Sequence, residues 1–287
     1  MTNPFDGLPE PWAVEWGEDR YGVFAGFAVG NVVQRMRWIP PGRFVMGSPE
    51  GEAGRYEDET QHEVKIANGF WLGDTPVTQA LWEAVMGNNP SHFKTPDRPV
   101  EMVSWDDCQE FIGRLNEMVP ALEARLPTEE EWEYACRAGT TTTTWVGNWE
   151  ILGPCDAPSI DSIAWYAGNC GVDFELNDGY DTVDWPRKQY PHTKGGTHPV
   201  RRKAPNPWGI YDMLGNVFEM CSDYYAPYTA DATQEKLPVL IGNERIIRGG
   251  SAGSRARKIR AAARGALHER NRDNDLGLRL ACGGSTR

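Results

Sequence analysis

The sequence predicts a loop-rich α+β fold with short antiparallel strands and two or three helices. The chain of 287 residues contains 31 Gly, 21 Pro and 12 Trp, a combination typical of irregular backbone held by large aromatic side chains. Several short segments alternate apolar with polar or small residues, as strands do, and three segments carry helix start signals. We expect the helices near residues 79–86, 106–118 and 129–138.

The first part of the chain is expected to form strands. Residues 21–33 alternate apolar and small side chains, which predicts a short hairpin. Residues 37–48 place a Pro-Pro-Gly turn between two apolar stretches, and residues 62–66 alternate again. The acidic, Gly-containing segment 51–61 between them predicts a surface loop.

Capping patterns support the second and third helices. Ser104 stands three residues before Asp107, and Thr128 stands three residues before Glu131, as in a capping box. Gly139 is expected to end the third helix. After it, residues 140–200 show little periodicity. Large aromatic side chains there favour packed loops over disorder: Trp145, Trp149, Trp165, Tyr166 and Trp185.

The charge balance restricts the kind of partner. The formal charge is −12, which argues against binding to a nucleic-acid phosphate backbone. The segment from Arg245 to Arg272 is nevertheless rich in Arg. These side chains either meet an anionic ligand or clamp acidic loops of the same domain.

Targeting and redox signals point to a cytoplasmic protein. The N-terminus lacks the basic and apolar regions of a signal peptide, and no apolar run reaches the roughly 18 residues of a membrane span. The six cysteines form no C-x-x-C pair, so reduced thiols are expected. Cys155 and Cys170 flank one loop, where a disulfide is the alternative.

Four phrases resemble those of one family, in the order in which the family has them. They are WIPPGRFVMGS at 38–48, RLPTEEEWEYACRAG at 125–139, WGIYDMLGNVFE at 208–219, and RIIRGGS at 245–251 with LGLRL at 276–280. The chain thus resembles the formylglycine-generating enzyme, or sulfatase-modifying factor, family over about residues 35–281. The resemblance implies a C-type-lectin-like fold for residues 36–284, with residues 1–35 as an N-terminal extension packed on that domain.

The copper site of the active members is expected to be absent. Those members hold copper with two cysteine thiolates in the terminal stretch, because copper(I) prefers soft sulfur ligands. Alignment on RGGS places Ser254 and Ile259 near those cysteines, and residues 249–281 contain no cysteine at all. We therefore expect no copper and no conversion of cysteine to formylglycine.

The resemblance also implies a structural calcium site. Its ligands would be the side chains of Asp212 and Glu219 and the backbone carbonyls of Gly215 and Val217. Carboxylate and carbonyl oxygens on an irregular loop suit this hard cation. The alternative is a hydrogen-bonded turn without an ion.

A family member without its copper ligands is expected to bind a protein or small-molecule partner. Two kinds of binding protein use this scaffold: variable proteins of diversity-generating retroelements, and immunity-type proteins that neutralise toxins. The candidate binding residues lie in the C-terminal hairpin: Ser254, Arg255, Arg257, Lys258, Ala263, Leu267, His268, Arg270, Asn271 and Asp273. The framework residues that match the family are instead expected to hold the backbone in place, through Gly conformations and Arg hydrogen bonds. We call them the frame: Arg248, Gly249, Gly250, Arg264, Arg272 and Arg279. The alternative function is an oxidoreductase of the same family that modifies a cysteine or another sulfur-containing substrate.

Overall fold

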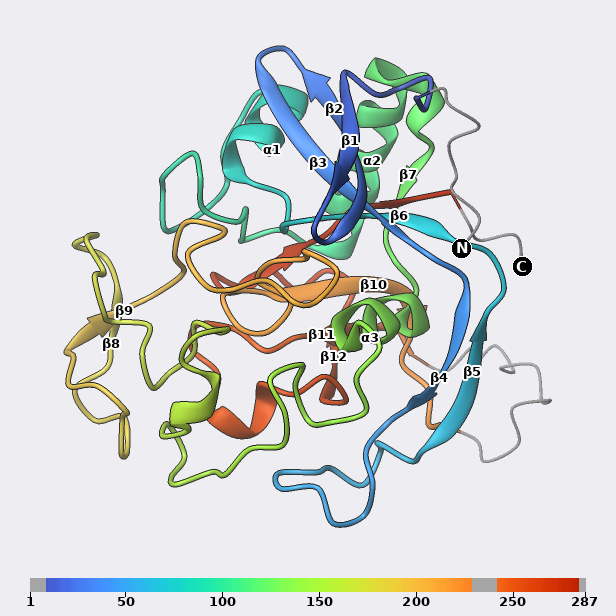
Figure 1. The fold of residues 1–287 in the computed structure, drawn as a ribbon. Helices are drawn as coiled ribbons and strands as arrows, with labels where there is room; N and C mark the ends of the chain where they lie inside the picture. The colour runs from blue at the N-terminus through green and yellow to red at the C-terminus, as the bar shows by residue number, and fades with distance from the viewer. Residues whose placement is uncertain (1–8, 229–241, 284–287) are drawn as a thin grey trace.

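The computed structural model describes residues 9–228 and 242–283. Its largest sheet is antiparallel throughout, with the strand order β1-β2-β3-β6-β14-β7 (Figure 1). The strands are β1 (Glu15–Asp19), β2 (Gly22–Val29), β3 (Val32–Ile39), β6 (Phe70–Gly73), β7 (Ala124–Arg125) and β14 (Ala281–Cys282). The C-terminal strand therefore lies between strands from the first half of the chain.

A second sheet has four strands in the order β12-β11-β10-β13. They are β10 (Phe218–Tyr224), β11 (Glu244–Arg248), β12 (Arg264–His268) and β13 (Leu276–Leu278). Two ribbons complete the described strands: β4 (Gly42–Met46) with β5 (His62–Ile66), and β8 (Tyr180–Asp181) with β9 (Lys194–Gly195). The predicted α+β class, with short and mostly antiparallel strands, is confirmed.

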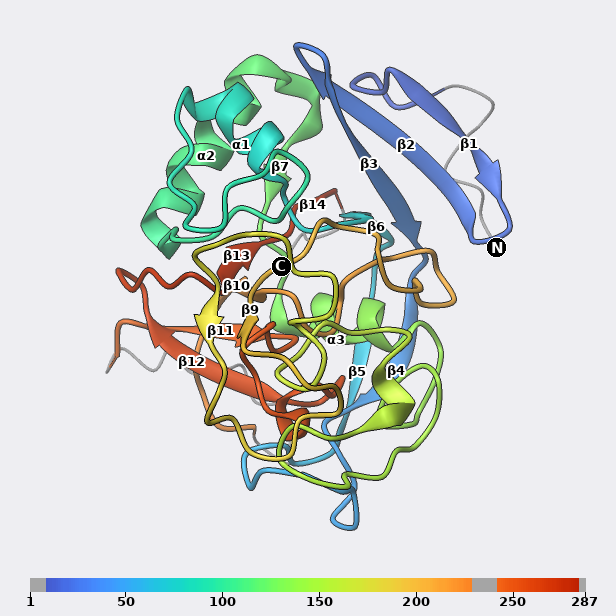
Figure 2. The ribbon, with the colours of Figure 1, turned by 90° about the vertical axis from the view of Figure 1, so that its left-hand side faces the viewer.

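The three expected helices are present as α1 (Gln79–Met86), α2 (Trp105–Met118) and α3 (Glu129–Arg137). Both capping boxes form: Ser104 with Asp107, and Thr128 with Glu131, each accept and return a hydrogen bond. α1 and α2 pack together beside the six-stranded sheet, and α3 lies next to the second sheet (Figures 1 and 2). Single 3₁₀ turns are η1 (Pro120–Leu122), η2 (Pro158–Ile160) and η3 (Ala256–Lys258).

The long segment 140–200 is packed as the aromatic residues predict. Within it only β8, β9 and η2 are regular, yet Trp149, Trp165 and Tyr166 are buried. Their cluster also contains Trp132 of α3 and Ile246 of β11, so these loops cover the second sheet and α3.

The structure can be compared with three further expectations: the domain boundaries, the state of the cysteines and the membrane spans. The domain boundary expected at residue 35 falls inside β3, so the extension and the domain share one sheet; the boundary at 284 lies outside the described residues. All six cysteines are free and buried, including Cys155 and Cys170. Across 9–228 and 242–283, every helix is too short or too polar to cross a bilayer.

Candidate binding face and metal loop

Buried arginines hold the C-terminal segment in place. Arg248 is fully buried, pairs with Glu133 and donates to the backbone carbonyls of residues 261–263. Arg264 donates two hydrogen bonds of 2.8 Å to the Glu129 carboxylate on α3. For these side chains the internal clamp, rather than an anionic ligand, explains the Arg-rich sequence.

Sequence reasoning missed one member of this network. Arg260 is fully buried and donates to both oxygens of Glu59 at 2.5 and 2.7 Å, and to Glu52 at 2.8 Å. The contact ties the acidic loop 51–61 to the C-terminal segment. The one signal in the sequence is charge complementarity between two segments that lie far apart along the chain.

The candidate binding residues divide by exposure. Arg255, Arg257, His268, Arg270, Asn271 and Asp273 are exposed, and Lys258 and Leu267 are half-buried. Ser254 and Ala263 are buried, at 8% and 3% exposure, and so are removed from the contact surface. The reason is packing: the Ser254 hydroxyl bonds to Ser251, and the Ala263 carbonyl accepts a hydrogen bond from Arg248.

The exposed residues form two separate groups. We call the first the Tyr56 patch: Arg257 stacks 3.7 Å above the Tyr56 ring and donates to two carbonyls of loop 51–61, with Lys258 4.5 Å from the same ring. The second is the 268–273 loop. Residues 259–263 and strand β12 separate the two groups along the chain.

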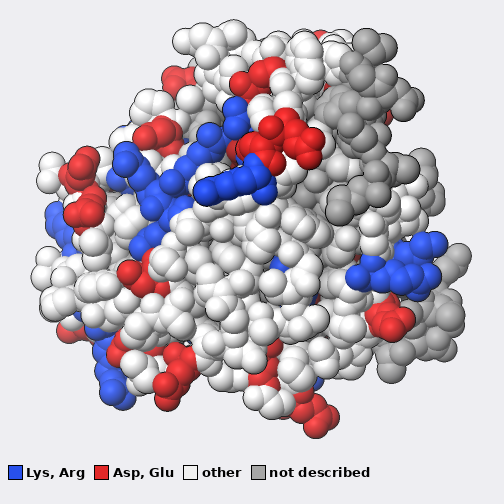
Figure 3. Space-filling model, in the orientation of Figure 1, with Lys and Arg blue, Asp and Glu red and all other residues white. Residues whose placement is uncertain are grey.

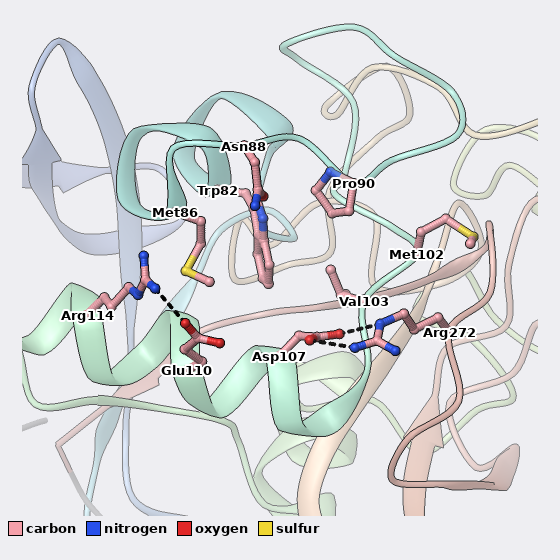
Figure 4. Close-up of a pocket in the computed structure, with 10 residues that line it drawn as sticks. All are labelled: Trp82, Met86, Asn88, Pro90, Met102, Val103, Asp107, Glu110, Arg114 and Arg272. Atoms are coloured by element: carbon pink, nitrogen blue, oxygen red, sulfur yellow. Dashed lines mark hydrogen bonds and ion pairs between the residues drawn. The ribbon is translucent and has the colours of Figure 1, made fainter.

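The 268–273 loop borders a pocket of about 210 Å³ (Figure 4). Trp82 and Met86 of α1 and Pro90 of the following turn form its apolar side. On the opposite side, Arg272 donates to both oxygens of Asp107 on α2, at 2.7 and 2.8 Å. The pocket results from the packing of α1 against α2, so no local sequence pattern predicts it.

At the aligned copper position, hydroxyl groups and an alkyl group replace the thiolates. The Ser254 hydroxyl lies 3.0 Å from the Ser251 hydroxyl, which donates to Asp275 at 2.5 Å. Ile259 is fully buried and packs against Gly250. Burial raises the pKa of all six cysteine thiols, so the thiolate form that copper(I) needs is disfavoured at each.

The expected calcium loop contains a buried acid without a cationic partner. Asp212 has a left-handed φ of 55° and is 2% exposed. Its Oδ2 accepts a 2.8 Å hydrogen bond from the Arg201 backbone, while its Oδ1 has only a 3.4 Å contact with Asn216. Burial raises the pKa of Asp212 to about 6, which shows that its charge is poorly compensated.

The second expected ligand is already neutralised. Arg279 donates to Glu219 Oε1 at 2.6 Å and to Oε2 at 2.9 Å, and Trp132 donates to Oε2 at 2.7 Å. Because each carboxylate oxygen has two acceptor sites, Glu219 retains one on Oε1. Asp212 and Glu219 thus each keep a free acceptor site on one carboxylate oxygen, which is the donor chemistry that a calcium ion at this loop would use.

Comparisons with known proteins identify the family of this chain. The sulfatase-modifying factor enzyme 1-like domain matches residues 24–283. The chain belongs to this family. Among the solved structures, Treponema denticola variable protein 1 superposes with a TM-score of 0.69 at 27% identity, covering 90% of this chain and 98% of that one.

Two curated proteins are similar to this chain in sequence. The chaperone protein LppX of Paenibacillus barcinonensis is 32% identical, over 57% of this chain and 66% of that protein. The formylglycine-generating enzyme of Mus musculus is 28% identical, over 77% of this chain and 53% of the enzyme. The chain thus spans between about half and two thirds of the length of these relatives.

This sulfatase-modifying factor domain also buries an acid that the sequence did not single out. Glu101 is fully buried; its Oε1 accepts a 2.7 Å hydrogen bond from the Phe93 backbone, and its Oε2 has no hydrogen-bond partner in the described structure. Burial raises the pKa of Glu101 to about 7, and the nearby charge of Asp275 contributes.

Proposed function

We propose that the protein is a copper-independent binding module that captures a protein or small-molecule ligand through the Tyr56 patch and the 268–273 loop. The observation that carries the proposal is the division of the C-terminal segment. The frame arginines Arg248, Arg264 and Arg279 are buried in ion pairs, whereas Arg255, Arg270 and Asn271, which lie between them in the sequence, are exposed. Arg272, which was also expected in the frame, is an exception: it is exposed and pairs with Asp107.

Several observations support this assignment. One solved structure with this fold is named a variable protein, which supports a retroelement-type binding role rather than catalysis. On the face shown in Figure 3, Lys and Arg lie in several places, the largest group at the upper left, with Asp and Glu beside them, and much of the rest is uncharged. Such mixed charge suits a protein or small-molecule partner better than a nucleic acid.

A double substitution tests the binding surface. Changing Arg257 and Lys258 to Ala removes exposed contacts with Tyr56, so the melting midpoint should fall by only about 2–4 °C, for a loss of about 1 kcal/mol. Recovery of a partner from an extract of the source cells should fall strongly. Arg43→Ala, an exposed change on β4, is the matched control. Unfolding of the double variant would show that the Tyr56 patch is structural.

The alternative function, modification of a cysteine, is tested directly. The purified protein is incubated with copper, oxygen and a C-x-P-x-R peptide, and the products are analysed by mass spectrometry. We expect no aldehyde product, because a hydroxyl and an alkyl group stand at the aligned ligand positions Ser254 and Ile259. Detection of formylglycine would establish the oxidoreductase instead.

Calcium is the proposed structural cofactor, held by Asp212, Glu219 and the carbonyls of Gly215 and Val217. An ion that binds only the folded state adds about 2.7 kcal/mol at a hundredfold excess over its Kd. Calcium should therefore raise the melting midpoint by several degrees relative to chelator, and Asp212→Asn should abolish the difference. Equal melting midpoints with calcium and with chelator would show that this segment is a hydrogen-bonded turn without an ion.

A further inference from the structure

Among the described residues, the six-stranded sheet ends at β1, whose outer edge pairs with no other strand. β1 pairs with β2 on one side only, and Figure 2 shows it at the outer border of the sheet. Its register with β2 is continuous from Glu15 opposite Gly26 to Asp19 opposite Gly22, so no bulge interrupts it. β1 contains no Pro, and the charges that protect this edge are all acidic: Glu15, Glu18 and Asp19.

Apolar side chains lie exposed along this edge. Trp16 is 53% exposed and the preceding Val14 is 58% exposed. Because side chains two residues apart point to the same side of a strand, Val14, Trp16 and Glu18 share one face. An exposed indole beside unpaired backbone groups is a typical platform for a partner strand.

The charges of β1 favour one kind of occupant. Glu15 and Asp19 pair with Arg35 and Arg37 of β3 at 3.0 and 2.7 Å, whereas Glu18 is exposed and has no ion pair within the described part of the chain. An antiparallel second copy centred on Gly17 would place Glu15 opposite Asp19 of the partner strand, and like charges directly opposite are unfavourable. A segment with basic side chains meets Glu18 favourably.

The edge is separate from the surface proposed above. The matched family domain begins at residue 24, so β1 lies outside it and extends the sheet by one strand beyond β2. We propose that the free edge of β1 binds an extended segment of a partner protein by β-strand addition, and that one face of this segment carries apolar side chains flanked by basic ones. Backbone hydrogen bonds would hold the segment, Val14 and Trp16 would contact its apolar side chains, and Glu18 would pair with a basic one.

A pair of peptides with opposite charges tests this. The blocked peptide Ac-KTVTVTK-NH2, whose Lys and Val side chains share one face of a strand, is titrated into the ¹⁵N-labelled protein. Ac-ETVTVTE-NH2 is its charge-reversed counterpart. We expect saturable shifts centred on the amides of residues 14–19, and about tenfold weaker binding of the acidic peptide, because complementary charge selects the partner. Shifts centred elsewhere, or equal binding of both peptides, would overturn the proposal.

Three variants make the test specific. Trp16→Ala should weaken binding of the basic peptide about fivefold or more, because the indole is the apolar anchor. Val33→Ala, at a side chain 51% exposed on the interior strand β3, should leave binding unchanged. Glu18→Lys should reverse the preference toward the acidic peptide, and at this exposed site the protein should remain folded. Trp16-dependent dimerisation without peptide, seen by sedimentation, would mean that the occupant is a second copy and would overturn the proposal.

Discussion

Replacement of Arg279 by Ala should lower the free energy of unfolding by about 3–5 kcal/mol, the usual result of removing one partner of a buried ion pair. Arg279 is fully buried, forms two hydrogen bonds with Glu219, and donates to the carbonyls of Gly73 and Tyr211 at 2.8 Å each. The substitution leaves the Glu219 carboxylate charged, buried and without a counter-ion. It also leaves two carbonyls without their donor.

Urea unfolding of the variant, with Arg272→Ala as the matched control, measures this effect. Arg272 makes an equally well-formed pair with Asp107, but its side chain is 51% exposed, so its loss should cost about 1 kcal/mol or less. The loss of unfolding free energy for Arg279→Lys should lie between the other two losses, because an ammonium group keeps the charge but cannot form the bidentate contact. Equal losses at Arg279 and Arg272 would contradict the buried-clamp interpretation.

Glu101→Gln should remove much of the pH dependence of stability between about pH 4.5 and 7. The pKa of Glu101 is about 7 in the folded state and near its ordinary value when unfolded, so the folded protein holds the proton more tightly. Below the unfolded pKa both states are protonated and there is no penalty. As pH rises through this window, the wild type loses on the order of 3 to 4 kcal/mol, at about 1.4 kcal/mol per pKa unit.

Gln resembles the protonated acid and does not titrate, so the variant should be more stable than the wild type at pH 8 and equal to it at pH 4. Thermal unfolding of both proteins across this range measures the difference. Some dependence should remain, because burial also raises the pKa of Asp275. Parallel curves for the two proteins would show that Glu101 is already charged at low pH or has a hydrogen-bond donor in solution.

Local signals predicted the regular elements well. Capping residues placed α2 and α3 to within a residue, because a helix start depends on side chains three positions apart, as with Ser104 and Asp107. The aromatic residues of the 140–200 segment correctly predicted packing without regular structure. The position of β14 between β6 and β7 could not be predicted from its own residues, because it depends on strands from distant parts of the chain.

The candidate site was only partly predictable. The RGGS phrase located the C-terminal segment, but whether a given Arg faces solvent depends on acids elsewhere, such as Glu59 for Arg260 or Glu219 for Arg279. For the same reason Ser254 was expected on the surface and is buried by its contact with Ser251. Periodicity carries no information about such long-range pairs.

The position of β14 has a consequence for biosynthesis. β6 and β7 do not pair with each other; each pairs with β14, through Leu72 and Arg125 opposite Ala281. The large sheet is therefore incomplete until the strand at 281–282 has left the ribosome. Long-range pairing of this kind slows folding, since the loop between the strands must close first. The nascent protein should thus expose the edges of β6 and β7 throughout translation, and a chain that stops before β14 should be a substrate for chaperones and proteases.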